Sequence, residues 1–347
     1  MSFLTRTLVA LLAFTTLVSA SPAPSLSVSK RDNSTSTSNS TCTTKTQRKA
    51  WHKMTNDEKQ AYIDAELCLI NTPATLGFAG AQTKFDELQY CHVWQSNVIH
   101  YSGQFLPWHR YFMYAHEYQL QTICNYTGGQ PYWEEVLDTK NNSLQMADSP
   151  IFDTVYGFGG NGQGDDWCVQ DGPFANMTNH LGPYYEISDT CLSRQFVPSY
   201  FSLGNQTYID ECMAMDNYWD AHWCWKSNPH SNAHLGVNGT ILDTVASPGD
   251  PLFYLHHTNL DRLWWEWQAV NLTARLYDMS GGNTPPVWWL DKNYMKHITE
   301  AQIEGFNDPT NHTSLQHNLI MEGIVPNTTI ESVMDIGNDL LCYEYVY

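Results

Sequence analysis

The sequence has 347 residues, 42% of them hydrophobic, and a formal net charge of −19 at pH 7. This length and apolar content suffice for one large domain, or two small ones, with a well-packed core. Nucleic acids and anionic membranes select basic protein surfaces, so the acidic balance argues against both classes of partner.

The N-terminal residues predict a secreted, extracellular protein. Residues 1–20 are organised like a signal peptide, with Arg6 before a short apolar stretch and Val18-Ser19-Ala20 as a small-residue cleavage site. No stretch of the chain is apolar for long enough to span a bilayer, so we expect no membrane anchor. We expect residues 21–46 to be a pro-segment and a disordered leader rich in Ser and Thr.

Cysteines and glycosylation signals agree with a secretory route. Nine cysteines predict a disulfide framework, and because their number is odd at least one is free or otherwise modified. Their pairing stays open at this point. Ten Asn-x-Ser/Thr sequons predict a glycosylated surface: Asn33, Asn39, Asn125, Asn141, Asn176, Asn205, Asn238, Asn271, Asn311 and Asn327.

We expect one folded domain over residues 47–347. A capping-box signature that begins at Thr55 precedes apolar residues at helical spacing, which predicts a first helix. Two more helices are expected, one over about 83–100 and one from Pro107 to about 124. Gly, Pro, Asp and Asn are frequent over 128–205, which predicts long loops with only short elements.

Two further helices are expected to carry histidines. Asn228 and Pro229 resemble a helix cap and a first-turn proline. The next helix is expected to use Asp250 as its cap and Pro251 as its first residue, and to run to about Val270. The predicted fold is therefore mainly α, a four-helix bundle around a central site, with long loops and a few short β-strands.

The histidines carry the most specific signal in the sequence. Three imidazoles for each ion, without thiolates or several carboxylates, suit Cu, Zn or Ni rather than Ca or Mg. The segment between His230 and His234 lacks the glutamate of the zinc-protease motif, which disfavours metal-dependent proteolysis. Six of the 14 histidines fall into two groups of three on neighbouring predicted helices, namely His92, His100 and His109, and His230, His234 and His257.

The spacing of these motifs resembles that of the type-3 dicopper proteins, which comprise tyrosinases, catechol oxidases and haemocyanins. The likeness covers about residues 48–345. Three motifs carry it. The first is Pro107-Trp108-His109, with His100 nine residues before His109. The others are His230-xxx-His234 and a run that includes Asp250-Pro251, His256-His257 and Asp261-Arg262.

The resemblance implies a tyrosinase-like catalytic domain over 47–347, of the short secreted form known from fungi. It implies two copper ions as the cofactor and O2 as co-substrate. It assigns one copper to His92, His100 and His109, and the second to His230, His234 and His257.

Two residues beside the expected ligands are given supporting roles. We prefer His257 to His256 as the ligand because the family's ligand lies four residues before the aspartate, here Asp261. His256 is then expected to support the ligands from behind or to pack. Because positions i and i+4 share a helix face, Asp261 is expected to lie alongside His257 and orient its ring.

The ends of the domain resemble the family as well. Tyr343 and Tyr345 resemble the Tyr-x-Tyr signature that closes the catalytic domain, with Arg48 as the arginine that stacks on it; the alternative is simply a Tyr-rich tail. Many relatives carry a cysteine two residues before the second ligand, joined to it by a thioether. Val98 stands there in this sequence, so no such bond is expected.

The resemblance implies an oxidase that converts o-diphenols (catechols) to o-quinones while O2 is reduced to water. In tyrosinases, an Asn or Asp after the first ligand of the second copper and an upstream Glu hold a water that deprotonates monophenols. Here Ser231 follows His230, and Ala221 stands where some relatives place the Glu. Leu235 is expected at the entrance of the substrate site. These departures favour a predominantly o-diphenol oxidase, with weak monophenol hydroxylation left open.

Three alternatives remain at this point: a tyrosinase with full monophenolase activity, an o-aminophenol oxidase, and an O2-binding carrier of the haemocyanin kind. We expect no shielding domain after the catalytic domain, and this expectation favours an open site and hence an enzyme. The expected partner is a small-molecule phenol, and the expected oligomeric state is a monomer or weak dimer.

Overall fold

The computed structural model describes residues 42–143, 146–292 and 295–347, with the backbone alone for 140–143. These residues belong to one compact unit. The predicted signal peptide and residues 21–41 of the predicted leader lie outside the described residues. Residues 42–46 of the predicted leader belong to the folded domain instead, because Cys42 forms a disulfide with Cys342 and a strand begins at Thr46. Within the described ranges, no helix combines the length and the apolar character that crossing a membrane requires.

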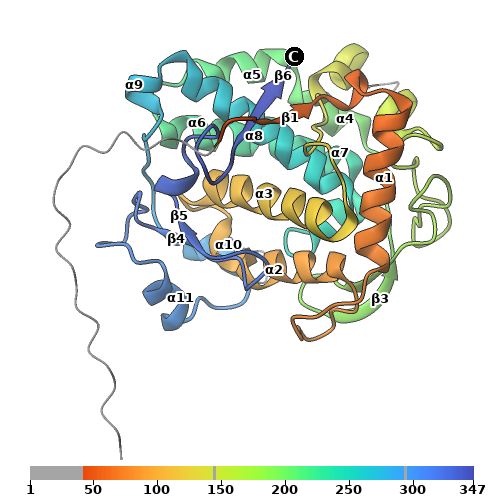
Figure 1. Cartoon of the computed structure of the whole chain (residues 1–347), viewed down its shortest axis with the longest axis horizontal. Helices are drawn as coiled ribbons and strands as arrows, with labels where there is room; N and C mark the ends of the chain where they lie inside the picture. Colours follow the sequence, from red (N-terminus) through yellow and green to blue (C-terminus); the bar gives the residue numbers. More distant parts are fainter. Residues whose placement is uncertain (1–41, 144–145, 293–294) are drawn as a thin grey trace, which may run out of the picture. The chain divides into compact units, whose positions relative to one another are not determined.

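Helices dominate the described residues, which confirms the mainly α prediction (Figure 1). The helix α3 packs against α8, α1 and α2, and these elements form the frame of the domain. The helices are α1 (Asn56–Asn71), α2 (Lys84–Ile99), α3 (Phe105–Cys124), α4 (Pro198–Phe201), α5 (Gln206–Met213), α6 (Tyr218–Trp225), α7 (Ser231–Val237), α8 (Leu252–Val270), α9 (Leu272–Arg275), α10 (Val287–Lys292) and α11 (Glu300–Gly305).

The first two long helices begin as the sequence predicts. Thr55 accepts a hydrogen bond from the Glu58 N–H while the Glu58 carboxylate accepts from the Thr55 N–H, so α1 starts with a complete capping box. Thr83 and Asp86 form a second capping box at the start of α2. Such a cap contributes about 1 kcal/mol to helix stability. The helix α3 begins two residues before Pro107, whose missing N–H would lack a helical partner anywhere in the first turn.

The prediction that Asn228 and Pro229 start a helix is wrong. The helix α6 continues through a π-helical turn, Lys226–His230, directly into α7, and Pro229 lies inside this turn. A π-turn shifts the hydrogen-bond ladder from i−4 to i−5, which gives a proline room within a helical path. The result places His230 at the end of the π-turn and His234 one turn later in α7.

The helix α8 carries the second histidine pair and is anchored at its start. The Asp250 carboxylate accepts from the Leu252 N–H at 3.0 Å, which confirms its capping contact, although Pro251 precedes the first helical residue. The same carboxylate binds the buried guanidinium of Arg194, with N–O distances of 2.8 and 2.7 Å. A loop residue thereby fixes the N-terminus of α8.

The segment 128–205 consists of loops with short elements, as predicted. Its short helical turns include Glu135–Ser143, and its strands β2 (Thr178–Leu181) and β3 (Ile187–Cys191) form an antiparallel pair. A second antiparallel pair joins β4 (Asn318–Leu319) and β5 (Thr328–Thr329). These elements surround the helical frame.

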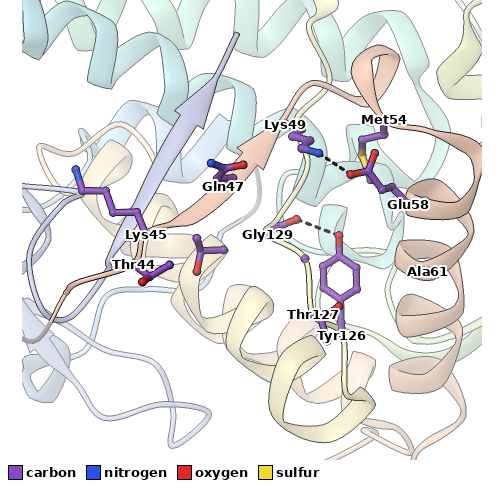
Figure 2. Close-up of a pocket in the computed structure, with 12 residues that line it drawn as sticks. Thr44, Lys45, Gln47, Lys49, Met54, Glu58, Ala61, Tyr126, Thr127 and Gly129 are labelled. Atoms are coloured by element: carbon purple, nitrogen blue, oxygen red, sulfur yellow. Dashed lines mark hydrogen bonds and ion pairs between the residues drawn. The ribbon is translucent and has the colours of Figure 1, made fainter.

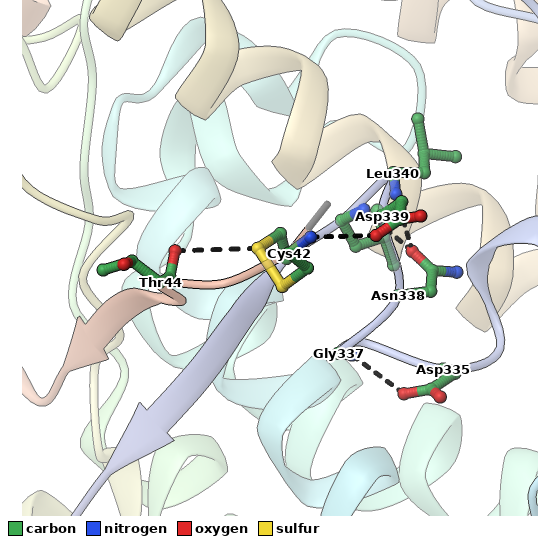
Figure 3. The surroundings of a disulfide bond; sticks show 9 residues. Cys42, Thr44, Asp335, Gly337, Asn338, Asp339 and Leu340 are labelled. Atoms are coloured by element: carbon green, nitrogen blue, oxygen red, sulfur yellow. Dashed lines mark hydrogen bonds between the residues drawn. A yellow bond between two sulfur atoms is a disulfide. The ribbon is translucent and has the colours of Figure 1, made fainter. Parts of the chain in front are cut away.

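The two ends of the described chain meet in a parallel two-stranded sheet. The strand β1 (Thr46–Lys49) pairs with β6 (Tyr343–Val346), which places Arg48 opposite Tyr345. The disulfide Cys42–Cys342 lies next to this sheet (Figure 3). The N–H of Cys42 also donates to the Asp339 carboxylate at 2.9 Å.

The predicted disulfide framework is confirmed, and the odd cysteine is identified. Cys91 is free and fully buried, in the residue before His92. The other pairs besides Cys42–Cys342 are Cys68–Cys124, Cys168–Cys191 and Cys212–Cys224.

Candidate metal centre

The first group of expected ligands comes together at the junction of α2 and α3. His92 lies within α2, His100 directly follows it, and His109 lies in the second turn of α3. One ring nitrogen from each of the three lies within 4.8 Å of the others. The ring centroids are 5.1 to 5.7 Å apart. All three side chains are buried.

Backbone carbonyls orient the three rings of this group. The Nδ1 atoms of His92, His100 and His109 contact the carbonyl oxygens of Val245, Ser96 and Phe105 at 2.8, 2.9 and 2.7 Å. A carbonyl oxygen only accepts, so each Nδ1–H donates and each neutral ring presents the Nε2 lone pair. The Nε2 atoms of His92 and His109 are buried without a partner among the described residues. Such atoms suit metal coordination.

The second group gathers four histidines rather than three. His230, His234, His256 and His257 each offer a ring nitrogen within 4.8 Å of the others. His234 Nδ1 donates to the Ile241 carbonyl at 2.5 Å, and His230 Nδ1 donates to the Lys226 carbonyl at 3.3 Å. The Nε2 atoms of His230 and His234 face one another at 3.2 Å.

The two groups face each other across a shared interior. The rings of His109 and His257 stack with their centroids 4.3 Å apart and their planes at 15°. Phe253 contacts both groups, with its ring centroid 4.1 Å from His257 and 5.4 Å from His92. Two ions held by these groups would therefore be neighbours in one buried chamber.

Electrostatics keep these imidazoles neutral. Burial, reinforced by the neighbouring histidines, lowers the pKa of His92, His109 and His257 well below the usual value. Burial first, and then His256, lowers the pKa of His234 to about 3. A metal binds the neutral form of imidazole, so the ligands need no deprotonation before they bind.

The structure corrects the role expected for Asp261. His257 has neither ring nitrogen in a hydrogen bond among the described residues, so the orienting contact from Asp261 is not formed. The Asp261 carboxylate instead binds Arg110 Nε at 2.5 Å and accepts from the hydroxyls of Tyr343 and Tyr345, both at 2.5 Å. The carboxylate therefore anchors the C-terminal strand to α8 and α3.

The expected stacking of Arg48 on the closing tyrosine pair is confirmed. The Arg48 guanidinium carbon lies 3.5 Å from the centroid of the Tyr343 ring. Arg48 also pairs with the buried Glu117 carboxylate. These contacts join β1, β6 and α3.

His256 belongs to the second histidine group and is more than a packing residue, because one of its ring nitrogens lies within 4.8 Å of a ring nitrogen of each other member. Its Nδ1 contacts the Glu135 carboxylate at 2.5 Å, and its Nε2 has no partner within the described part of the chain. Burial raises the pKa of Glu135 well above its usual value. Sequence reasoning missed Glu135, because it lies in the loop-rich segment more than a hundred residues before its partner. The choice of His257 over His256 as ligand stays a prediction.

A cavity of about 210 Å³ opens onto the histidines. Ser231 and Leu235, the two residues expected on the substrate side, both line it. The Ser231 hydroxyl donates to the Lys226 carbonyl at 2.7 Å. Ala221, at the position of the family's upstream Glu, is fully buried and does not line the cavity. Phe253 lines the cavity as well. Sequence reasoning missed the other walls, which include Tyr101, Leu242, Thr244, Trp289 and Lys226.

A larger cleft of about 510 Å³ lies elsewhere, between β1 and the start of α1. Figure 2 shows Lys49 paired with Glu58 and the Tyr126 hydroxyl donating to the Gly129 carbonyl in this cleft. No histidine lines it. Its size does not make it the functional site, because the chemically competent groups surround the smaller cavity.

Known proteins resemble the chain in sequence and in structure. Residues 82–270 match the family model described as the common central domain of tyrosinase. The tyrosinase-like protein phomQ1' of Diaporthe leptostromiformis is 32% identical, over 87% of this chain and 80% of that protein. The N-acetyl-6-hydroxytryptophan oxidase ivoB of Emericella nidulans is 28% identical, over 86% of this chain and 91% of that protein.

The structural comparison agrees. A polyphenol oxidase of Thermothelomyces thermophila superposes with a TM-score of 0.73 and 28% identity, covering 86% of this chain and 88% of that one. The matched region of the family model extends from the residue before the α2 cap to the end of α8 and so spans all seven clustered histidines. The chain belongs to the tyrosinase family.

Proposed function

We propose that this tyrosinase-family oxidase binds two copper ions and converts o-diphenols to o-quinones while O2 is reduced to water. Two o-diphenols supply the four electrons and four protons that one O2 needs to become two waters. The observation that carries the proposal is the pair of facing histidine groups. The buried Nε2 atoms of His92, His109 and His257 lack partners within the described residues, and the rings of His109 and His257 stack across the interior.

The donor set fits copper. Neutral imidazoles tolerate both Cu(I) and Cu(II), whereas zinc has no redox chemistry. We propose that His92, His100 and His109 hold one ion and that His230, His234 and His257 hold the other. Copper supplies the electron transfer when it is bound; the chain fixes the imidazole geometry and shapes the space beside it.

The cavity fits a single aromatic ring. Its volume of about 210 Å³ is below the roughly 300–1,000 Å³ of pockets for drug-sized ligands. Phe253, Trp289, Leu235 and Leu242 supply apolar wall on which a phenol ring can pack and from which water is displaced. The open side of the cavity supports an enzyme over an O2 carrier, whose site would exclude phenols.

The cavity walls support diphenol oxidation over monophenol hydroxylation. No Asp or Glu lines the cavity in the described structure, so no carboxylate stands ready to take the proton of a monophenol. The Ser231 hydroxyl already donates to a backbone carbonyl, which leaves only its lone pairs to hold a water. Oxidation of a hydroxyindole is the second candidate, because the relative from Emericella nidulans is named as an oxidase of N-acetyl-6-hydroxytryptophan.

We also propose that the protein is secreted and acts on a small phenol as a monomer or weak dimer. Four disulfides support an oxidising compartment. The absence of a membrane-crossing helix from the described residues is compatible with this proposal.

Metal analysis together with oxygen uptake tests the proposal. Protein loaded with copper should contain two ions for each chain and should consume O2 with 4-methylcatechol. Tyrosol, a monophenol, should react slowly and with a lag, whereas hydroxytyrosol, its o-diphenol, should react without one. One ion for each chain would refute the dicopper site. Two ions without turnover of any diphenol would favour the carrier.

A further inference from the structure

A lysine side chain lies in the wall of the candidate substrate cavity. Lys226 begins the π-turn that ends at His230, and only 4% of it is exposed. Its Nζ atom lies 3.1 Å from the ring centroid of Tyr101 and 5.7 Å from that of Trp223. Tyr101 directly follows the expected ligand His100 and lines the cavity as well. The ammonium is therefore held on aromatic rings at the substrate side.

This ammonium has no anionic partner among the described residues. It donates no hydrogen bond and enters no ion pair there, although the sequence contains 36 acidic residues. Other lysines of the chain do find carboxylates: Lys49 pairs with Glu58, and Lys84 with Glu87. Burial of a cation without a counter-charge is costly, and contact with aromatic rings offsets only part of that cost. An anion that enters the cavity would supply the missing partner.

The backbone of Lys226 fixes the side chain relative to the histidines. Its carbonyl accepts from His230 Nδ1 at 3.3 Å and from the Ser231 hydroxyl at 2.7 Å. The ammonium is thus anchored through the same residue that orients an expected copper ligand.

We propose that Lys226 makes the cavity selective for phenols that carry a carboxylate on a short ring substituent. The ring packs among the apolar walls with its hydroxyls toward the histidines, and the carboxylate accepts hydrogen bonds from the Lys226 ammonium. This inference rests on the proposed function and adds a substrate class to it. Lys226 is a specificity-determining residue in this account, and a substrate with a cationic substituent is disfavoured.

A series of three catechols of similar size tests the proposal on copper-loaded protein at about pH 6. The series comprises 3,4-dihydroxyphenylacetate (anionic), 4-ethylcatechol (neutral) and dopamine (cationic). We expect kcat/KM to fall in that order. The ratio of kcat/KM for the anionic and neutral catechols should fall about tenfold or more in Lys226→Met, as expected for loss of a charged hydrogen bond. It should stay within about threefold in Lys226→Arg, which keeps the charge.

Lys296→Met provides a matched control. Lys296 also lies over aromatic rings, those of Tyr185 and Trp94, but it does not line the cavity. Its removal should leave the anionic-to-neutral ratio unchanged. Comparable thermal unfolding of all variants would show that the differences do not come from misfolding.

Binding without turnover separates this inference from the proposed function. Calorimetry should show that phenylacetate, which has no hydroxyl to oxidise, binds the wild type about tenfold more tightly than phenylacetamide, and that Lys226→Met loses this difference. If no catechol is oxidised, the proposed function fails, and the calorimetric difference alone decides the role of Lys226. Equal ratios in the wild type and Lys226→Met, in turnover and in binding, would overturn the inference while leaving catechol oxidation intact.

Discussion

The substitution Asp261→Asn should destabilise the domain more than any change at the cavity. Its buried carboxylate receives Arg110 Nε and the hydroxyls of Tyr343 and Tyr345, each at 2.5 Å, and Arg48 Nη1 lies 3.5 Å away. All of these groups donate N–H or O–H hydrogens to the Asp261 carboxylate. An amide of the same shape has one acceptor oxygen and presents an NH2 group to donors on its other side.

The expected magnitude follows from the burial of this network. Asp261 is 3% exposed, and both arginines are fully buried. Removal of one partner from a buried ion pair costs about 3–5 kcal/mol, because the remaining charge stays desolvated. That is a large share of the roughly 5–15 kcal/mol by which domains are stable. Tyr345→Phe removes a hydroxyl that donates to Asp261 and also lies 3.1 Å from the Thr258 carbonyl oxygen. Because no charged group is lost, this change should cost less, about 1.5–3 kcal/mol.

Guanidinium unfolding of the metal-free protein measures both changes. Metal-free protein is needed because bound copper would add its own stabilisation to the folded state. Tyr200→Phe serves as the control, since Tyr200 is 48% exposed and its loss should change stability by less than about 0.5 kcal/mol. A cost below about 1 kcal/mol for Asp261→Asn would refute the assignment of Asp261 as the buried anchor of β1, β6, α3 and α8.

Three further outcomes are expected. His257→Ala should bind one copper for each chain and lose catechol oxidation, whereas His256→Ala should retain both ions; elemental analysis decides, and the reverse pattern would make His256 the ligand. Burial opposes ionisation of Asp308, but hydrogen bonds and charge from His317 outweigh this effect and lower its pKa. The loss of unfolding free energy in Asp308→Asn should therefore be greatest at pH 6 and should shrink as the pH falls below about 4. Urea unfolding at pH 6 and below about pH 4 checks this. A stability difference between the wild type and Asp308→Asn that grows in acid would contradict it. Cys91 is fully buried, so iodoacetamide should modify it only after unfolding, as mass spectrometry would show.

Local signals made much of the helical frame predictable. The capping box at Thr55 and the apolar periodicity that follows it depend on residues a few positions apart, so the sequence contains the whole interaction. The spacing of His230 and His234 and the adjacency of His256 and His257 are local in the same way. Six of the seven clustered histidines could therefore be assigned to their groups before the structure was known, whereas His256 was expected only to support the ligands or to pack.

The partners of charged side chains were not predictable, because they depend on long-range packing. Asp261 is four residues from His257, and helical geometry alone favours their contact. Tyr343 and Tyr345, which are 82 and 84 residues away, take its oxygens instead. Glu135 reaches His256 across 121 residues, and no local pattern marks it. The π-turn around Pro229 was missed for another reason: Asn-Pro is a strong helix-start signal that the surrounding helix overrides.

His257 is held by a different physical means from the other five expected ligands, and this difference bears on how the site can work. In the first group every ring is fixed by a backbone carbonyl, so its geometry follows from the positions of α2, α3 and the loop that carries Val245. In the second group His257 has no such bond and is held by stacking on His109 and Phe253. Stacking fixes the plane of a ring but leaves it freer to slide than a hydrogen bond does. His257 is therefore the most adjustable of the expected ligands, and it lines the cavity together with Ser231 and Lys226.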